Sequence, residues 1–215
     1  MTQTAMNTSS IEYHEGELRI VRDTTNPRRL VPDAEDAASI LDIGCGAGQT
    51  LLAIGARKRR VGIDIDINAL EFGRSRAAGP GIQLAAARGE NLPFADRSFD
   101  FVYSRVALPY MDIPAAVSEM HRVLRPGGRL WLTLHSLAIP AAQFRRGNLK
   151  GRVYAAYTIF NGLWFHVSGR TLRLKRGMCE SIQTKRGMRV ALSRAGFSNI
   201  AFQRTRYHFT VTATR

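Results

Sequence analysis

The hydrophobic positions of this chain form short apolar runs that alternate with stretches of helical periodicity. Runs typical of strands occupy residues 39–43, 61–66, 82–86, 99–104 and 129–134. Helices are predicted between and after these runs, at 48–55, 68–77, 114–124 and 185–195. Two last segments, 198–204 and 207–214, predict a closing pair of strands. Strands that alternate with helices are typical of an α/β fold with a parallel sheet.

A turn rich in glycine follows the first run. Residues 40–50 read ILDIGCGAGQT, so Gly44, Gly46 and Gly48 stand at alternate positions between a strand and a helix. Because glycine lacks a Cβ atom, such a turn can adopt positive φ and let a ligand lie against the backbone. A nucleotide-like ligand is the first hypothesis. The spacing counts against NAD or FAD, whose sites favour G-x-G-x-x-G, and the Walker lysine pattern is absent.

A carboxylate ends the second run, about twenty residues after the turn. This run reads VGIDID, and Asp64 stands where such sheets bind ribose hydroxyls. A carboxylate suits two vicinal hydroxyls because it accepts both hydrogen bonds. The alternative role for Asp64 is a helix N-cap, for which Asp66 or Asn68 would serve equally well.

Four segments stand in an order that is known from one enzyme family. They read ILDIGCGAGQT at 40–50, VGIDID at 61–66, ENLPFADRSFDFVYS at 90–104 and EMHRVLRPGG at 119–128. The set resembles the motifs of class I S-adenosylmethionine-dependent methyltransferases, in the small-molecule branch that includes ubiquinone and menaquinone biosynthesis enzymes. The resemblance implies a Rossmann-like α/β fold, with a mostly parallel seven-stranded sheet whose last strand is antiparallel and with helices on both faces. It also implies S-adenosyl-L-methionine as the cofactor.

The resemblance further implies which residues contact the cofactor. The glycine turn would hold its methionine part, and Asp42 would lie near its amino group. The loop after the third strand departs from the family pattern G-D-A-x-x-L-P-F, because Arg88 stands where the pattern has an aspartate that contacts adenine. The backbone around Gly89, or the side chain of Glu90, would then read the adenine ring. The expected cofactor residues are Asp42, Gly44, Cys45, Gly46, Gly48, Asp64, Ile65, Arg88, Gly89, Glu90 and Ser104.

Three residues are candidates for acting on the methyl acceptor. His135 stands at the carboxyl end of the fifth strand, and its unperturbed pKa near neutrality suits a general base; a capping or packing histidine is the alternative. Tyr110 follows the fourth strand. Tyr13, with His14 and Arg22, belongs to an N-terminal segment that in related enzymes often folds over the donor site. A solvated N-terminal helix explains these three residues equally well.

The charge of the chain is divided unequally. The formal net charge is +14, and residues 1–140 hold 16 basic and 16 acidic side chains, whereas residues 141–215 hold 15 and 1. This asymmetry indicates that the C-terminal third meets an anionic partner, unless a high-arginine host proteome decorates surfaces in this way. Within it, residues 153–167, VYAAYTIFNGLWFHV, are apolar and lie between cations. The segment fits an interfacial helix on an anionic membrane, a lid over a hydrophobic acceptor, an RNA-binding face or a packed cap helix.

The composition of the chain limits the class of protein to which it can belong. At 215 residues and 45% hydrophobic content the chain can bury one core. No apolar run reaches the roughly 20 residues that cross a bilayer, and the N-terminus lacks signal-peptide features. Two cysteines, Cys45 and Cys179, are too few for a disulfide framework or a zinc site, and no metal cluster is expected. We therefore expect a cytoplasmic protein, in solution or peripheral at the membrane.

One methyltransferase domain is expected over residues 1–215. It would comprise an N-terminal cap segment at 1–38, a cofactor-binding core at 39–135, a basic and aromatic insertion or lid at 137–185, and the last helix with the closing strand pair at 186–215. Residues 1–10 are predicted to lack regular structure. The leading hypothesis is methyl transfer to a small, hydrophobic or membrane-derived acceptor. An RNA methyltransferase that docks through its basic C-terminal third, and a non-catalytic cofactor-binding scaffold, are the alternatives.

Overall fold

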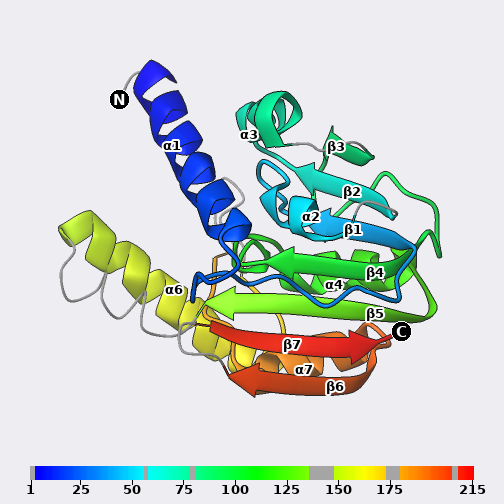
Figure 1. The fold of residues 1–215 in the computed structure, drawn as a ribbon. Helices are drawn as coiled ribbons and strands as arrows, with labels where there is room; N and C mark the ends of the chain where they lie inside the picture. Colours follow the sequence, from blue (N-terminus) through cyan, green and yellow to red (C-terminus); the bar gives the residue numbers. More distant parts are fainter. Residues whose placement is uncertain (1–2, 56–57, 78–80, 136–147, 173–179, 205–207) are drawn as a thin grey trace.

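The computed structural model describes residues 3–55, 58–77, 81–135, 148–172, 180–204 and 208–215 (Figure 1). Its strands are β1 Ser39–Ile43, β2 Arg59–Asp64, β3 Ile82–Ala86, β4 Phe99–Arg105, β5 Leu124–His135, β6 Ser198–Arg204 and β7 His208–Thr214. Its α-helices are α1 Gln3–Arg22, α2 Gln49–Ala53, α3 Ile67–Phe72, α4 Ile113–Val123, α6 Leu149–Ser168 and α7 Lys185–Arg194. A π-helical turn, Gly73–Ala77, follows α3, and a 3-10 turn, Leu108–Tyr110, precedes α4.

The strands form one sheet in the order β3-β2-β1-β4-β5-β7-β6. Strands β1 to β5 are parallel to one another, and β7 runs antiparallel to both β5 and β6. In Figure 1 the arrowheads of β1, β2, β4 and β5 accordingly point to the same side, whereas β7 points the other way. The expected α/β fold, with seven strands and an antiparallel last strand, is confirmed.

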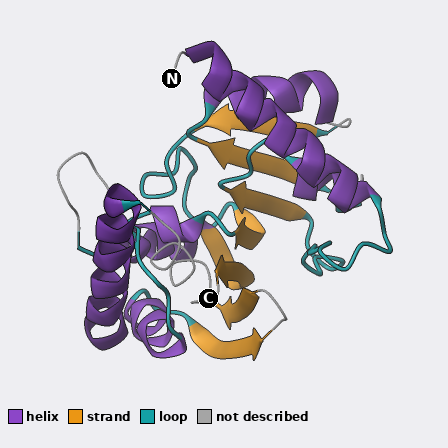
Figure 2. Cartoon of the chain, turned by 90° about the vertical axis from the view of Figure 1, so that its left-hand side faces the viewer, coloured by secondary structure: helices purple, strands orange, loops and turns teal. Residues whose placement is uncertain are grey.

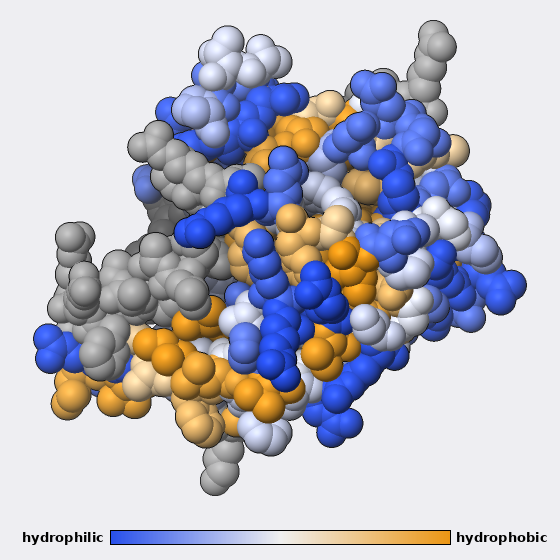
Figure 3. All heavy atoms as spheres, turned by 90° about the horizontal axis from the view of Figure 1, so that it is seen from below, coloured by the Kyte–Doolittle hydropathy of each residue, from blue (hydrophilic) through white to orange (hydrophobic). Residues whose placement is uncertain are grey.

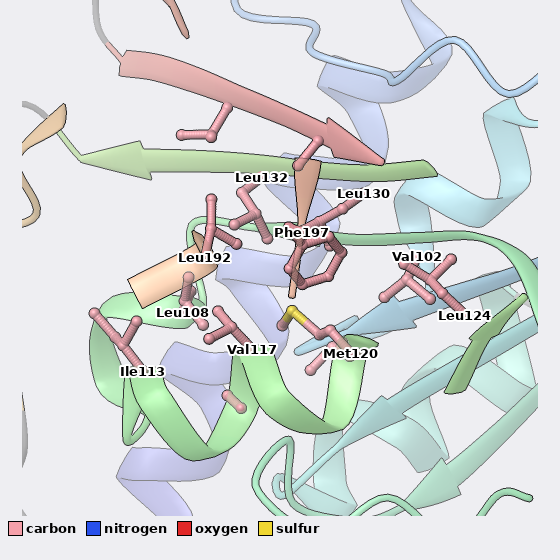
Figure 4. Close-up of a cluster of buried hydrophobic side chains, with 14 of the residues drawn as sticks. Val102, Leu108, Ile113, Val117, Met120, Leu124, Leu130, Leu132, Leu192 and Phe197 are labelled. Atoms are coloured by element: carbon pink, nitrogen blue, oxygen red, sulfur yellow. The ribbon is translucent and has the colours of Figure 1, made fainter. Parts of the chain in front are cut away.

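Two cores lie on opposite faces of this sheet, because neighbouring residues of a strand point to opposite sides. On one face, Leu41 and Ile43 pack with α4 and α7; on the other, Ile40 packs with side chains of α2 and α3. Figure 4 shows the first core, in which Val117 and Met120 of α4 face β5. Both faces of the central strands are therefore buried, as parallel sheets require.

Several predicted boundaries were wrong: β5 begins at Leu124 rather than at 129, and β2 ends at Asp64 rather than at 66. Residues 3–10, expected to lack regular structure, belong to α1. Once the packed half of a helix has formed, each further turn needs no new nucleation, so a polar sequence can continue it. His14, Leu18 and Val21 are the buried residues of that half. The helix predicted at 48–55 is shorter than expected, because α2 ends at Ala53 and Ile54 is already extended.

The loop between β3 and β4 is fastened to α4 by one arginine. The Arg122 guanidinium donates hydrogen bonds to the carbonyls of Phe94 (2.7 Å) and Leu92 (3.0 Å) and to the carboxylate of Glu119 (2.7 Å). Glu119 in turn accepts from the backbone N–H of Leu92 (2.7 Å). The hydrogen bonds from Arg122 lower the pKa of Glu119. Together, Arg122 and Glu119 fix a loop that begins beside the ends of the central strands.

We expect Arg122→Gln to lower the free energy of unfolding by about 2 kcal/mol, since hydrogen bonds that involve a charged group are lost from a partly buried loop. Urea denaturation at neutral pH measures this change. The matched control is Arg186→Gln, at an exposed position of α7, which should change stability by less than about 0.5 kcal/mol. Equal effects of the two substitutions would contradict the role of Arg122.

Candidate functional site

A cavity of about 320 Å³ opens at the carboxyl ends of the parallel strands. Figure 2 views the molecule from this side, with the strand ends toward the viewer. The lining comes from α1, from the segments after β1, β2, β3 and β4, and from the turn before α4. Open α/β sheets bind their ligands in this position, because successive loops diverge there.

The glycine turn forms the floor of the cavity. Gly44, Gly46 and Gly48 have φ values of 76°, 54° and 73°, in the left-handed region that favours glycine. The backbone N–H groups of Gly44 and Cys45 both donate to the carbonyl of Ile63 (2.8 and 3.0 Å), which ties the turn to β2. A Cβ atom added to Gly44 would lie 2.2 Å from that of Ala107, so the segment after β4 also leaves no room for a side chain.

Asp64 connects the end of β2 to this turn. Its carboxylate accepts hydrogen bonds from the backbone N–H groups of Gly46 (2.7 Å) and Asp66 (3.0 Å). The N-cap of α3 is Asp66, which accepts from Asn68 (3.0 Å) and Ala69 (3.3 Å), so Asp64 is not needed for that role. Each Asp64 oxygen keeps a further lone pair, and a ligand hydroxyl in the cavity can donate to it.

Asp42 is a buried carboxyl group in the cavity wall. Its residue is 2% exposed, and its Oδ1 atom has no hydrogen-bond partner within the described part of the chain. Burial raises the pKa of Asp42 to about 7, although the neighbouring Tyr103 and Arg105 act in the opposite direction. A buried acceptor without a partner is costly, so this atom marks a place where a donor group of a ligand would be stabilised.

The loop after β3 supplies a third side of the cavity. Gly89 is buried, and an added Cβ atom would lie 2.6 Å from the sulfur of Met111. The side chain of Glu90 accepts from the backbone N–H of Asp112 (3.1 Å) and lies 3.6 Å from Arg88. The side chain of Arg88 is 66% exposed, which places it at the rim of the cavity.

Helix α1 covers one side of the cavity. Glu17 forms an ion pair with Arg105 at the end of β4, and both side chains are only 12% exposed. His14 lies over the glycine turn, because a Cβ atom added to Gly46 would be 2.7 Å from its ring. Burial lowers the pKa of His14, so its imidazole is neutral at pH 7. Tyr13 also lines the cavity.

The structure brings most of the expected cofactor residues together. Those that line the cavity are Asp42, Gly44, Cys45, Gly46, Asp64, Ile65, Arg88, Gly89 and Glu90. Ser104 does not, because its hydroxyl is buried and donates to the carbonyl of Ile43 (2.8 Å) between β4 and β1. Gly48 belongs to the turn but faces Leu84 rather than the cavity.

The acceptor candidates are distributed around the same cavity. Tyr13 and Tyr110 line it, whereas Arg22 ends α1 away from the lining. His135 is the last residue of β5, and its side chain lies outside the described part of the structure. The role of His135 as a base therefore stays a prediction.

Several lining residues were missed from the sequence. They are Gln49, Thr50, Ala87, Arg105, Val106, Ala107 and Met111. The rule that strand ends line such sites would have found Arg105, the last residue of β4. Val106 carries no such signal: it has a φ of 56°, rare for a β-branched residue, and this turn of the chain sets Ala107 against Gly44.

Comparison with known proteins agrees with this geometry. Residues 41–132 match the family model described as Methyltransferase domain. Human N-acetylserotonin methyltransferase, solved with SAM, is 14% identical and superposes with a TM-score of 0.65 over 97% of this chain and 56% of its own. An S-adenosylmethionine-dependent methyltransferase from Mesorhizobium loti is 22% identical, with a TM-score of 0.61 over 86% and 94% of the two chains. At these identities the superpositions show the fold alone.

Curated relatives match about half of this chain. Demethylmenaquinone methyltransferase from Staphylococcus epidermidis is 34% identical over 128 residues, which is 57% of this chain and 50% of that protein. The enzyme of the same name from Symbiobacterium thermophilum is 40% identical over 99 residues, 42% and 39% of the two chains. The chain therefore spans half or less of the length of these relatives.

The sheet order, the antiparallel β7 and the glycine turn define the class I methyltransferase fold. Together with the family model, they show that residues 41–132 belong to a class I S-adenosylmethionine-dependent methyltransferase domain, with distant homology to the demethylmenaquinone enzymes. The methyl donor of this family is S-adenosyl-L-methionine.

We expect Gly46→Val to reduce donor affinity at least roughly tenfold, or about 1.4 kcal/mol, because the new side chain would displace His14 and strain a residue at positive φ. Isothermal titration with S-adenosylmethionine measures this effect. The matched control is Gly55→Val, at an exposed position where an added Cβ meets nothing within 4 Å. Circular dichroism confirms that both variants fold, and parental affinity in Gly46→Val would refute the placement of the site.

Proposed function

We propose that this chain transfers a methyl group from S-adenosylmethionine to a small, hydrophobic acceptor of membrane origin. The observation that carries the proposal is the cavity at the strand ends, whose wall contains a glycine turn and two carboxylates on adjacent strands. The acceptor class is supported by the apolar outer surface of α6, which lies at the same end of the sheet (Figure 1).

The residues of the cavity fit the donor. The open oxygen of Asp42 would accept from its ammonium group, the turn at Gly44 and Gly46 would lie along its methionine part, and Asp64 would accept from its ribose hydroxyls. Gly89 and the side chain of Glu90 would border the adenine, as Arg88 cannot accept a hydrogen bond. Bound in this way, S-adenosylmethionine supplies an activated methyl group on a sulfonium, ready for in-line displacement.

The protein has to align the acceptor with this methyl group and exclude water. Alignment alone can lower a barrier by roughly 7 to 11 kcal/mol. Helix α1, held by the Glu17–Arg105 ion pair, closes one side of the cavity. We infer that the segment 1–38 acts as a cap and the segment 137–185 as a lid of the core formed by 39–135; of the lid, residues 148–172 and 180–185 are described.

Tyr13 and Tyr110 are proposed to contact the acceptor. Partial burial at the cavity raises the pKa of both phenols, and nearby Glu17 and Glu180 respectively add to the effect. Both hydroxyls are therefore protonated at neutral pH and can donate a hydrogen bond to an acceptor oxygen, but neither serves as a base. An acceptor that must lose a proton would need His135, at the end of β5, in that role.

The names of the relatives support an apolar acceptor. The two bacterial enzymes are demethylmenaquinone methyltransferases, and a 36% identical relative from Caenorhabditis elegans is a sterol 4-C-methyltransferase. In the last case the match covers 41% of this chain and 28% of that protein.

Donor binding is expected to release a proton from Asp42. With a pKa raised from 3.8 to about 7, the folded protein holds this proton at pH values where the unfolded chain has lost it. The stabilising contribution is complete below about pH 4 and is lost as the pH rises through 7. A cationic donor favours the ionised carboxylate, so its affinity should rise with pH up to about 7 to 8.

Titration calorimetry about one pH unit below this pKa, in buffers of different ionisation enthalpy, measures the released proton. Asp42→Asn should abolish the release and weaken binding by about 2 kcal/mol, roughly thirtyfold. Asp36→Asn is the control, because its side chain is 74% exposed and pairs with Arg129 outside the cavity. Equal proton release by parent and Asp42→Asn would assign the titration to another group.

Transfer of radiolabelled methyl into an extract of the host that lacks this gene tests the activity. We expect the label in the organic phase after phase separation, because the proposed acceptor is hydrophobic. Gly46→Val serves as the matched inactive protein, so label that persists with this variant is not due to the site.

Label in a ribonuclease-sensitive precipitate would overturn the acceptor class and assign the basic C-terminal third to RNA. If no fraction is labelled although the donor binds, the chain is a cofactor-binding scaffold and transfer is refuted.

A further inference from the structure

Helix α6 carries an apolar stripe along its outer face. The stripe consists of Leu149, Val153, Phe160, Leu163, Trp164 and Val167, which are 45% to 79% exposed. Their spacings of 4, 7, 3, 1 and 3 residues put all six on one side of a helix with 3.6 residues per turn. In Figure 3, hydrophobic residues gather along the edge of the molecule where α6 lies. Isolated exposed apolar residues are ordinary, but a continuous stripe of this length marks a contact surface.

The opposite face of α6 packs against the rest of the protein. A Cβ atom added to Gly162 would lie 2.7 Å from Ile182, and one added to Gly187 of α7 would lie 2.6 Å from Phe165. Asn161, which is completely buried, donates to the carbonyls of Glu180 (3.0 Å) and Leu172 (3.2 Å). Close packing and buried hydrogen bonds therefore fix the rotation of α6, and the stripe cannot turn inward.

Positive charge surrounds the stripe. Lys150, Arg152 and Arg170 are exposed at the two ends of α6, and the C-terminal third as a whole has 15 basic residues against 1 acidic residue. That acidic residue, Glu180, accepts a hydrogen bond from the hydroxyl of Tyr154 on the same helix. The surface around the stripe thus combines apolar side chains with an excess of cations, which is typical of helices that lie in a membrane interface.

Other occupants fit this surface less well. Four of the six stripe residues are aliphatic and offer no ring on which a nucleic-acid base could stack. A second copy of the chain would bring two strongly basic faces together, and like charges at an interface are repulsive. An anionic bilayer fits both the cations and the apolar stripe, since its headgroups attract the cations and its acyl region takes up the stripe. In the described part of the chain, no helix is long and apolar enough to cross a bilayer.

Helix α6 also lies beside the cavity. Tyr154 of α6 is bound to Glu180, and Glu180 is close enough to Tyr110, in the cavity lining, to raise the pKa of its phenol. Figure 1 places α6 at the end of the sheet where the parallel strands terminate. A surface that held α6 would therefore face the region through which an acceptor enters.

We propose that α6 docks this protein on an anionic membrane, with the apolar stripe at the acyl boundary and the flanking cations among the headgroups. The helix lies in the plane of the interface and does not span the bilayer. Docking requires neither the donor nor the acceptor, so membrane binding can be tested independently of the proposed methyl transfer.

Sedimentation with vesicles tests the proposal. The full chain should bind vesicles of equal parts phosphatidylglycerol and phosphatidylcholine, and binding should weaken at high salt and without phosphatidylglycerol. Phe160→Glu/Val167→Glu should lower the partition coefficient at least about tenfold, since it places two acidic groups in the stripe. Ile67→Glu/Ser118→Glu adds the same charge at exposed positions on α3 and α4 and should bind as the parent does.

A second readout uses Trp164 in a Trp131→Phe background. Its emission should shift to shorter wavelength on addition of the anionic vesicles, and brominated lipids should quench it. Equal partitioning of the two double variants, equal binding to vesicles without phosphatidylglycerol, or an unchanged Trp164 spectrum would each overturn the proposal. Two further outcomes would overturn it, if the stripe variant still bound vesicles as the parent does. One is altered RNA binding by that variant, and the other is an altered sedimentation coefficient in the absence of vesicles.

Discussion

The close approach of three strand ends around Gly44 and Gly46 is the constraint on which the rest of the site depends. The carbonyl of Ile63 receives two N–H groups of the turn, and the Asp64 carboxylate receives a third. Ala107, after β4, closes the other side at a distance that excludes any side chain from Gly44. Because the three connections fill one another's space, the turn is rigid, and a ligand meets a backbone surface that is already formed.

Asp42 shows how such rigidity is used. The carboxyl group is buried by the sheet itself, and its open oxygen faces the cavity with no partner in the described residues. Burial favours the protonated form of Asp42, so ionising its carboxyl group in the free protein costs free energy. A cationic ligand relieves this cost, which makes donor selection a consequence of desolvation rather than of exposed charge.

The two helices that flank the cavity are held by different means and serve different surfaces. Helix α1 is joined to the core by the Glu17–Arg105 pair and presents His14 and Tyr13 to the cavity. Helix α6 is joined by Asn161 and close glycine contacts, and turns its apolar side outward. The cavity is therefore built at the strand ends of the sheet, whereas the two outer helices add a cover on one side of it and an exposed apolar surface beside it.

The sequence by itself determined the features that depend on local pattern. Alternating apolar runs were enough for the strands, the three glycines for the turn, the carboxylate after β2 for Asp64, and the count of charges for the basic C-terminal third. Each of these is recorded within a few consecutive residues, because strand periodicity and positive φ are properties of short segments. The membership of Asp42 and Gly89 in one cavity followed from strand order, which the motifs also implied.

Only the tertiary structure decided where the remaining side chains point. Ser104 and Arg105 are neighbours at the end of β4, yet Ser104 turns to the carbonyl of Ile43 and Arg105 turns to Glu17 of α1. The left-handed backbone at Val106 then sets the position of Ala107. Likewise, the apolar segment at 153–167 showed no sidedness in its composition, and the packing of Asn161 and Phe165 chose which face became the stripe. These outcomes depend on contacts between residues far apart in the chain, and a local pattern does not contain them.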